Sequence, residues 1–366
     1  MNVYIRRLEL NNFRNYDSQK LVFTPGINVF FGENGTGKTN ILESIYWTAM
    51  SRSFRTAEDP ILVKQGRESA RITIDAVDNE IEKTFLMDYD SVNRKKNLYV
   101  NGTRLSRVSL IVGQVPVVLF SPENIMIVKG EPSLRRRFLD DLLSQIDNGY
   151  YVTLNKYLKE VSHRNYLLKG IREGRIKREN LDIWNNQIME NGIKLLVQRH
   201  AAVEELNLIL KKELTEGKFE VRLGYISKNY ASYSPSDLKS SYMEFFRTKI
   251  EDEIIRSATL IGPHRDDLEI YYNNLGAKNY ASEGQQRITT ILMKLAEGLL
   301  IKRKRGSYPV VLLDDFSSEL DEPNRGFIGK TFSLFKQILI TTTYKENLRG
   351  FEAAKEFKIQ NGKVVS

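Results

Sequence analysis

The segment Gly32-Glu33-Asn34-Gly35-Thr36-Gly37-Lys38-Thr39 decides the fold of this 366-residue chain. It matches the pattern G-x-x-x-x-G-K-[ST], in which glycines let the backbone wrap closely around phosphate oxygens at the start of a helix. The apolar run INVFF (27–31) before it predicts a strand, and NILESIYWTAM (40–50) after it predicts a helix. A strand, a glycine-rich loop and a helix in this order are typical of a P-loop rather than of an ordinary turn.

The residues of this loop have distinct expected roles. Lys38 is expected to bridge the β- and γ-phosphates of ATP, and the Thr39 hydroxyl is expected to ligate Mg²⁺. Asn40, the next residue, is assigned to the same nucleotide site. The other loop residues are expected to surround the phosphates, mainly through backbone N–H groups: Gly32, Glu33, Asn34, Gly35, Thr36 and Gly37. The sequence therefore predicts ATP and Mg²⁺ as ligands.

Two aspartates end a second apolar run, PVVLL (309–313), which suits a central parallel strand with acids at its carboxyl edge. Asp314 is expected to hold Mg²⁺ through water. Asp315 is expected to polarise the attacking water in ATP hydrolysis. ABC-type ATPases usually carry glutamate at the second acidic position, so the shorter side chain of Asp315 predicts slow hydrolysis.

The segment SEGQQR (282–287) precedes a helical pattern, ITTILMKLAEGLLI. Ser282 stands at the N-cap position, and capping alone would account for a serine there. The alternative is an ABC-type signature, in which the Ser282 hydroxyl, Gly284, Gln285 and the helix dipole meet a γ-phosphate. In that class the signature completes the nucleotide site of a second subunit, so ATP would join two copies.

Three further segments of the ABC-type pattern are less regular. Asp321 ends SELD (318–321), which has the spacing of a D-loop. Thr342 is assigned to the switch position, with Thr343 as the alternative, because the usual histidine is absent. The glutamine of the Q-loop is also absent from FSPEN (120–124), which leaves Glu123 or Ser121 as substitutes.

The rest of the chain divides into strand-like and helical parts. Alternating apolar patterns predict strands of a mixed sheet around one helix, and Asn101-Gly102 predicts a two-residue hairpin turn. Long helical periodicity predicts an antiparallel hairpin, interrupted by the polar segment 172–180. The expected strands are 3–10, 20–23, 71–77, 81–87, 96–105, 219–226, 267–272, 310–315 and 337–343, and the expected helices are 135–146, 150–171 and 185–214.

These patterns predict an α/β fold, an ABC/SMC-type P-loop ATPase head with an inserted helical arm domain. The head is assigned to residues 1–130 and 255–366, and the insertion to residues 131–254. The charge balance, 55 Lys and Arg against 46 Asp and Glu, gives +9 and favours a polyanionic partner, although such charge can also be a solvated face. The basic clusters 94–96, 135–137 and 302–305 are candidate DNA contacts; for 135–137, ion pairs with Asp140 and Asp141 are the alternative.

Composition also excludes several classes of site. The absence of cysteine rules out disulfides, cysteine-ligated zinc and a thiol nucleophile, and three histidines make a histidine-rich metal site unexpected. No stretch approaches the roughly 18 apolar residues that a membrane span needs. We therefore expect a cytoplasmic protein without a membrane partner.

The chain resembles the RecF family of bacterial recombination and replication-repair ATPases. The matching segments are LNNFRNY (10–16), PGINVFFGENGTGKTNILESIY (25–46), RSFRT (52–56), LFSPENIMIVKGEPSLRRRFLD (119–140), GPHRDDLEI (262–270), SEGQQR (282–287) and LLDDFSSELD (312–321). The resemblance implies an SMC-like head with shortened arms, an ATP-dependent homodimer and binding to double-stranded and gapped DNA at single-strand/double-strand junctions. It also implies partnership with RecR and RecO in loading RecA onto SSB-coated single strands, and a place for Arg14 near the nucleotide base.

Three other classes are weighed against this interpretation. A transporter ATPase subunit is disfavoured by the missing Q-loop glutamine and the large helical insertion. A long-armed SMC-like nuclease subunit is disfavoured because sustained heptads are absent. A small-molecule kinase of the P-loop class does not account for the signature and the paired aspartates.

Overall fold

The computed structural model describes residues 3–214, 220–315, 329, 331–344, 353–360 and 362–365. The chain forms two compact units: Met1–Ile125 with Thr290–Ser366, here called the head, and Met126–Thr289, here called the arm. These boundaries differ from those expected at 130 and 255. The physical reason is that strand β10 (Asp267–Tyr272) pairs along its whole length with β9 (Val221–Ile226), so the segment after residue 255 belongs with the arm.

An antiparallel sheet forms one part of the head, with strand order β2-β1-β4-β5-β6-β7. Its strands are β1 (Val3–Phe13), β2 (Tyr16–Val22), β4 (Ser69–Asp78), β5 (Ile81–Asp90), β6 (Lys95–Val100) and β7 (Thr103–Arg104). The predicted hairpin turn is confirmed, since Asn101 and Gly102 both have positive φ, 50° and 77°.

A second sheet of the head has the order β15-β14-β3-β13-β12-β8. Its strands are β3 (Gly26–Phe31), β8 (Val117–Phe120), β12 (Val310–Leu313), β13 (Gln337–Thr342), β14 (Ala353–Gln360) and β15 (Lys363–Val364). All neighbours are parallel except β14 and β15. The expectation of one mixed sheet was wrong, because the N-terminal strands form an antiparallel sheet separate from that of the P-loop strand.

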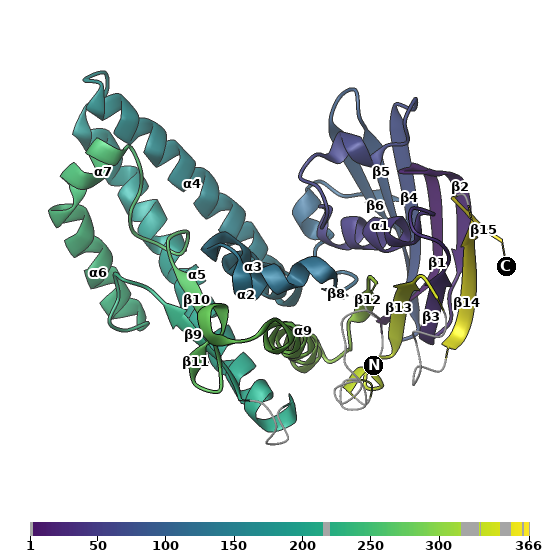
Figure 1. The fold of residues 1–366 in the computed structure, drawn as a ribbon. Helices are drawn as coiled ribbons and strands as arrows, with labels where there is room; N and C mark the ends of the chain where they lie inside the picture. The colour runs from purple at the N-terminus through teal and green to yellow at the C-terminus, as the bar shows by residue number, and fades with distance from the viewer. Residues whose placement is uncertain are drawn as a thin grey trace. The chain divides into compact units, whose positions relative to one another are not determined.

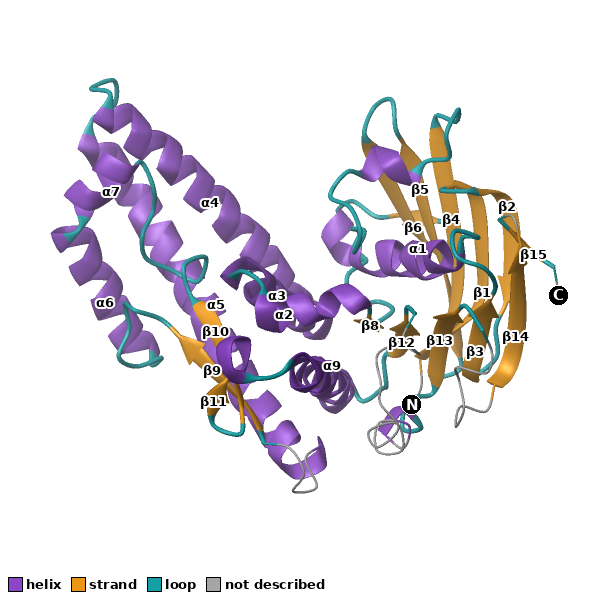
Figure 2. Cartoon of the chain, in the orientation of Figure 1, coloured by secondary structure: helices purple, strands orange, loops and turns teal. Residues whose placement is uncertain are grey.

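Helix α1 (Lys38–Met50) follows β3 and contacts strands of both sheets, as Figures 1 and 2 show. Every residue from Ile41 to Met50 is therefore buried, including the polar side chains of Glu43, Ser44 and Thr48. The short 3₁₀ helices of the head are Asp59–Leu62, Val108–Leu110 and Pro122–Ile125.

The arm contains the predicted helical hairpin. Helices α4 (Asn148–Arg172) and α5 (Asp182–Ile209) pack side by side and are joined through a short 3₁₀ turn, Arg178–Leu181 (Figure 1). Helices α6 (Pro235–Thr248) and α7 (Ile250–Arg256), which the sequence patterns did not predict, pack against this pair. The other arm elements are α2 (Met126–Lys129), α3 (Pro132–Ile146), the π-helical turn Leu210–Leu214, β11 (Leu275–Gly276) and α8 (Ala277–Tyr280).

The arm sheet has the order β11-β10-β9, so β9 is an edge strand. The side-chain amide of Asn207 on α5 closes this edge. Its Nδ2 donates to the carbonyl of Leu223 at 2.9 Å, and its Oδ1 accepts from the Leu223 N–H at 2.8 Å. An amide side chain thus takes the place of a neighbouring strand at this point.

Helix α9 (Glu283–Arg305) begins at the predicted signature in the arm and continues into the head after Thr289. A fully buried Glu297 forms an ion pair with Lys294 one turn earlier. In the described part of the chain, no helix combines the length and apolar character that crossing a membrane would require.

Candidate nucleotide-binding site

The glycines of the P-loop are required by its backbone. Gly32 has φ 152°, and a Cβ there would lie 2.3 Å from the carbonyl oxygen of Ile359 on β14. Gly37 has φ 108°, and a Cβ there would lie 2.5 Å from Nδ2 of Asn15. Conformation disfavours a side chain at both positions, and at Gly32 the backbone of β14 also leaves no space for one.

Lys38 begins α1 and turns back into the loop. Its Nζ donates to the carbonyl oxygens of Gly32 and Glu33 at 2.6 and 2.7 Å. Burial lowers the pKa of Lys38, and the nearby carboxylates of Asp314 and Asp315 oppose that shift. The structure thus places the predicted lysine inside the loop and electrostatically coupled to both predicted acids.

Asp314 follows β12 and accepts two hydroxyl hydrogen bonds on one oxygen. Thr39 and Thr341 each donate from Oγ1 to Oδ1 of Asp314, both at 2.7 Å. Burial raises the pKa of Asp314, whereas the two hydroxyl donors lower it. Carboxylate and hydroxyl oxygens suit Mg²⁺, which is usually held by one or two carboxylates together with water and substrate phosphates. The donor set that the sequence predicted, Thr39 and Asp314, therefore fits this cation.

Asp315 comes next and has a left-handed backbone, with φ 47°. Its N–H donates to Oγ1 of Thr341 at 3.0 Å, so one threonine contacts both predicted acids. The sequence patterns gave Thr341 no role of its own. The signal that identifies it is the parallel pairing of Leu313 with Ile340, which places the residue after each of them side by side.

The two candidate switch residues differ in what they face. Thr342 is fully buried, and its hydroxyl donates to the carbonyl of Tyr344 at 3.0 Å. The Thr343 hydroxyl donates to Oδ1 of Asn34 in the P-loop at 3.3 Å. The geometry therefore favours Thr343 over the assigned Thr342, because side chains alternate along β13 and its continuation.

The structure describes the predicted Q-loop segment but not the predicted D-loop segment. The D-loop assignment, including Asp321, lies outside the described residues. Of the two Q-loop substitutes, Glu123 is close enough for its charge to raise the pKa of Asp314. Ser121 instead donates its backbone N–H to Asn124 at 2.9 Å.

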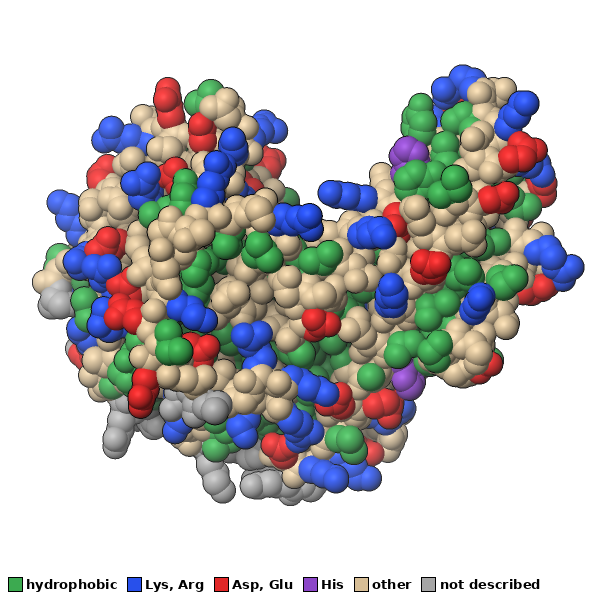
Figure 3. All heavy atoms as spheres, turned by 180° about the vertical axis from the view of Figure 1, so that it is seen from behind, with side chains coloured by type: hydrophobic (Ala, Val, Ile, Leu, Met, Phe, Trp, Pro, Cys, Tyr) green, Lys and Arg blue, Asp and Glu red, His purple; other side chains and the backbone are tan. Residues whose placement is uncertain are grey.

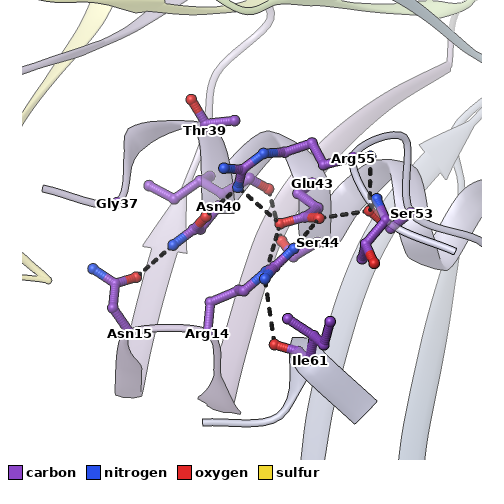
Figure 4. Close-up of polar contacts among 12 residues, drawn as sticks. Arg14, Asn15, Gly37, Thr39, Asn40, Glu43, Ser44, Ser53, Arg55 and Ile61 are labelled. Carbon is purple, nitrogen blue, oxygen red and sulfur yellow. Dashed lines mark hydrogen bonds and ion pairs between the residues drawn. The ribbon is translucent and has the colours of Figure 1, made fainter. Parts of the chain in front are cut away.

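Arg14 lies against α1 and is engaged by a carboxylate (Figure 4). Its Nε and Nη2 donate to the two oxygens of the fully buried Glu43 at 2.9 and 2.7 Å, and Nη1 donates to the carbonyl of Ile61. This bidentate pair fixes the guanidinium. Glu43 and the Ile61 carbonyl therefore orient Arg14. Its expected position near the nucleotide base stays a prediction.

Arg55 and two asparagines connect Glu43 to the P-loop (Figure 4). Arg55 donates from Nη1 to Oδ1 of Asn40 at 2.9 Å and to Glu43 at 3.3 Å. Asn40 donates to Asn15 at 2.8 Å, and Asn15 donates to the carbonyl of Thr36 in the loop at 3.1 Å. Arg55 and Glu43 were missed as site residues because only the fold brings them together.

The signature segment forms a capping box at the start of α9. The Gln285 N–H donates to Oγ of Ser282 at 3.3 Å, and the Ser282 N–H donates to Oε1 of Gln285 at 2.8 Å. The capping interpretation is confirmed. Ser282 and Gly284 are also exposed, and a Cβ on Gly284 would meet nothing within 4 Å, so this helix start is open to another molecule.

The comparisons with known proteins agree with these features. The family described as the RecF/RecN/SMC N-terminal domain matches residues 4–366. The DNA replication and repair protein RecF of Clostridium perfringens is 37% identical over 368 residues, which covers 99% of each chain. The chain belongs to the RecF family.

Solved structures support the fold of this RecF-family chain. A structure of the recombination mediator protein RecF with ATP, in the RecFOR pathway, has a TM-score of 0.92 at 33% identity, covering 100% of this chain and 97% of that one. The Smc head bound to the C-winged helix domain of ScpA has a TM-score of 0.55 at 19% identity. The predicted class, an ABC/SMC-type ATPase head with an inserted helical arm, is confirmed.

Of the three basic clusters of this RecF-family chain, 302–305 is exposed, whereas 94–96 and 135–137 are partly buried. Arg135 is 6% exposed and pairs with Asp267 at 2.7 and 2.9 Å, whereas Arg137 makes the expected ion pair with Asp141 at 3.9 Å. Lys96 donates to the carbonyl of Ser51. On the face drawn in Figure 3, Lys and Arg side chains are interspersed with Asp and Glu rather than gathered in one patch.

Proposed function

We propose that this chain is an ATP-dependent DNA-binding protein of replication and recombinational repair, acting as a pair of copies. Each pair would hold ATP between the P-loop of one copy and the Ser282 end of α9 in the other. One observation carries the proposal: Thr39, beside the P-loop lysine, and Asp314 meet through a 2.7 Å hydrogen bond at the end of the central strands. That arrangement is what phosphates bound with Mg²⁺ require.

The chain's own groups divide the work. Lys38 and the loop N–H groups bind the phosphates, and Thr39 with Asp314 would hold Mg²⁺, which neutralises phosphate charge when bound. Asp315 orients and polarises water, and the Thr343 hydroxyl, next to the P-loop Asn34, serves as the switch contact. We expect slow hydrolysis, because the carboxylate of Asp315 reaches one methylene less than a glutamate would.

The DNA-related part of the proposal rests on the family. Relatives with this architecture are DNA replication and repair proteins, and RecF structures are described within the RecFOR pathway. For this chain we propose binding at the junctions of gapped DNA, with RecO and RecR, to help load RecA onto SSB-coated strands. The net charge of +9 supports contacts with backbone phosphates.

Light scattering of the purified chain with ATP or ADP, with and without gapped DNA, tests the paired mechanism. We expect association with ATP and not with ADP. Lys38→Met should abolish ATP binding and association, whereas Lys239→Met, at an exposed position on α6, should change neither. A chain that stays monomeric with both nucleotides would refute the pairing, and unchanged ATP affinity in Lys38→Met would refute the P-loop assignment.

A further inference from the structure

Two sequence segments far apart in the chain, RRRFLD (135–140) and GPHRDD (262–267), meet inside the arm. Arg135 on α3 pairs with Asp267 at 2.7 and 2.9 Å. The next residue, Arg136, donates from Nη1 to the backbone carbonyl of Asp266 at 2.8 Å. The start of α3 is therefore anchored to the turn that precedes β10.

The carboxylates around this turn already have donors. Arg135 occupies both oxygens of Asp267. Asp140 accepts from the buried Arg199 at 2.7 Å and from Tyr150. Asp266 accepts from Tyr225 at 3.0 Å and is 2% exposed. Each of the three thus has hydrogen-bond donors of its own, and acts on Arg136 only through space, where its charge opposes the lowering of the Arg136 pKa by burial.

Two guanidinium groups in the described residues make no direct ion pair. Arg265 donates only from Nε, to the carbonyl of Thr259 at 3.0 Å, and its side chain is exposed. Arg136 is half-buried and donates only to the Asp266 carbonyl. Throughout the described ranges, no carboxylate lies within ion-pair distance of either. Burial lowers the pKa of Arg136, so a phosphate oxygen at its remaining N–H groups would stabilise its charge, and the exposed Arg265 can supply a second guanidinium.

The neighbour of Arg265 in this turn is a histidine that carries no charge of its own. His264 lies before Arg265, and its Nε2–H donates to the Thr259 carbonyl while Nδ1 accepts from the Tyr157 hydroxyl at 2.6 Å. The ring is therefore neutral, with both nitrogens occupied. Burial lowers the pKa of His264 to about 4, and the charges of Arg265 and Arg136 lower it further.

We propose that Arg136 and Arg265 form a phosphate-binding site in the arm, separate from the P-loop. The ligand class is a phosphate group, from either the backbone of DNA or the nucleotide held by a second copy. The site rests on the proposed function, because both ligand sources belong to it. Planar guanidinium groups anchored through one N–H keep their remaining donors in a fixed geometry, which suits phosphate oxygens.

The test uses the full chain with Arg136→Gln and Arg265→Gln. Arg256→Gln, at an exposed position in the last turn of α7, is the matched control. Affinity for a fluorescent gapped duplex is measured by anisotropy across a salt series, and ATP-driven association is measured by light scattering. Each site variant should lose about tenfold in DNA affinity, and the slope of log affinity against log salt should become shallower by about one. Arg136→Lys, which keeps the charge but not the planar donor geometry, should recover the salt slope and only part of the affinity.

The outcomes separate the two phosphate sources. Lost DNA affinity with normal ATP-driven association assigns the site to the DNA backbone, and the reverse assigns it to the nucleotide of a second copy. If both site variants behave like Arg256→Gln while the wild type binds DNA and ATP, the site is refuted and the proposed function stands. A wild-type chain that binds neither ligand overturns the proposed function together with the site.

Discussion

The hydroxyl of Thr341 connects the two acids that follow β12. It donates to Asp314 and accepts the N–H of Asp315, and Thr341 is 1% exposed. A buried donor of this kind orients a metal-binding carboxylate without touching the metal. We therefore regard Thr341 as a positioning residue for the proposed Mg²⁺ site.

Thr341→Val keeps the shape of the side chain and removes both hydrogen bonds. We expect the affinity for ATP in the presence of Mg²⁺ to fall roughly 10- to 100-fold, as for other residues that orient metal ligands. Titration with a fluorescent ATP analogue, once with Mg²⁺ and once with EDTA, measures this. Thr341→Ser should bind like the wild type. An equal loss with and without Mg²⁺ would show that Thr341 serves the fold alone.

The backbone of Asp315 gives a physical reason for its departure from the usual glutamate. With φ 47°, it occupies the left-handed region, which aspartate and asparagine tolerate better than longer side chains. Aspartate reaches less far towards a water molecule than glutamate does, but it fits this left-handed turn with less strain. Slow hydrolysis and local conformation would have the same origin.

His264 and Asp266 give stability contributions that oppose each other with pH. Burial lowers the pKa of His264 from 6.5 to about 4, so its contribution is complete above pH 6.5 and is lost as the pH falls towards 4. Burial raises the pKa of Asp266 from 3.8 to about 6, so the folded state becomes less stable as the pH rises from 3.8 to 6. Between pH 4 and 6 the two effects largely cancel.

His264→Gln should make the Asp266 effect visible. Glutamine can still donate to Thr259 but does not titrate, so the variant lacks the His264 contribution, which is roughly 2–3 kcal/mol between pH 7 and 4.5, and should become more stable as the pH falls through the Asp266 range. Urea unfolding of both chains at the two pH values measures the difference. An identical pH dependence of the two free energies of unfolding would contradict the buried, neutral histidine.

At the scale of elements, the sequence predicted continuous apolar strands and long periodic helices. β12 is a run of four buried residues, and α4 and α5 show helical periodicity over more than twenty residues, so both kinds of element were evident. β14 was missed because only Phe357 and Ile359 of its eight residues are buried, which leaves little alternation to detect. α6 was missed although Ser234 caps it and Pro235 starts it, because only Leu238 and Tyr242 are fully buried.

The sequence predicted those residues of the candidate site that belong to short local motifs. Lys38, Thr39 and Asp314 belong to local patterns, and the structure brings them together. Thr341 and Arg55 depend instead on strand register and on the fold around α1, which no short pattern contains. The contacts of Thr341 and Arg55 are therefore set by tertiary packing and not by a local sequence pattern.

Substitutions at Ser282 separate capping from nucleotide contact. Ser282→Ala should lower stability by about 1 kcal/mol, because the Gln285 N–H loses its acceptor. Ser282→Asp should retain the cap and the stability, but its negative charge should prevent ATP-driven association. Thermal unfolding and light scattering measure the two effects. Normal association of Ser282→Asp would show that the serine is only a cap.

At the scale of the whole molecule, the proposed pair makes a prediction about mixtures. Lys38→Met damages only the P-loop side of a shared site, and Ser282→Asp damages only the signature side. Mixed pairs would contain one intact site, built from the undamaged half of each chain. We expect each variant alone to fail in ATP-driven association and an equimolar mixture to recover it partly. No recovery in the mixture, with both variants folded, would argue against sites shared between copies.

The amide of Asn207 also affects how the chain behaves when crowded, for example during synthesis. A bare strand edge invites another polypeptide to add to it, which leads to swapped or aggregated species. By occupying the N–H and carbonyl of Leu223, Asn207 blocks the middle of β9 with a group that cannot propagate a sheet. The arm can thus contain a small sheet with an edge strand that offers few free backbone groups to a strand of another polypeptide.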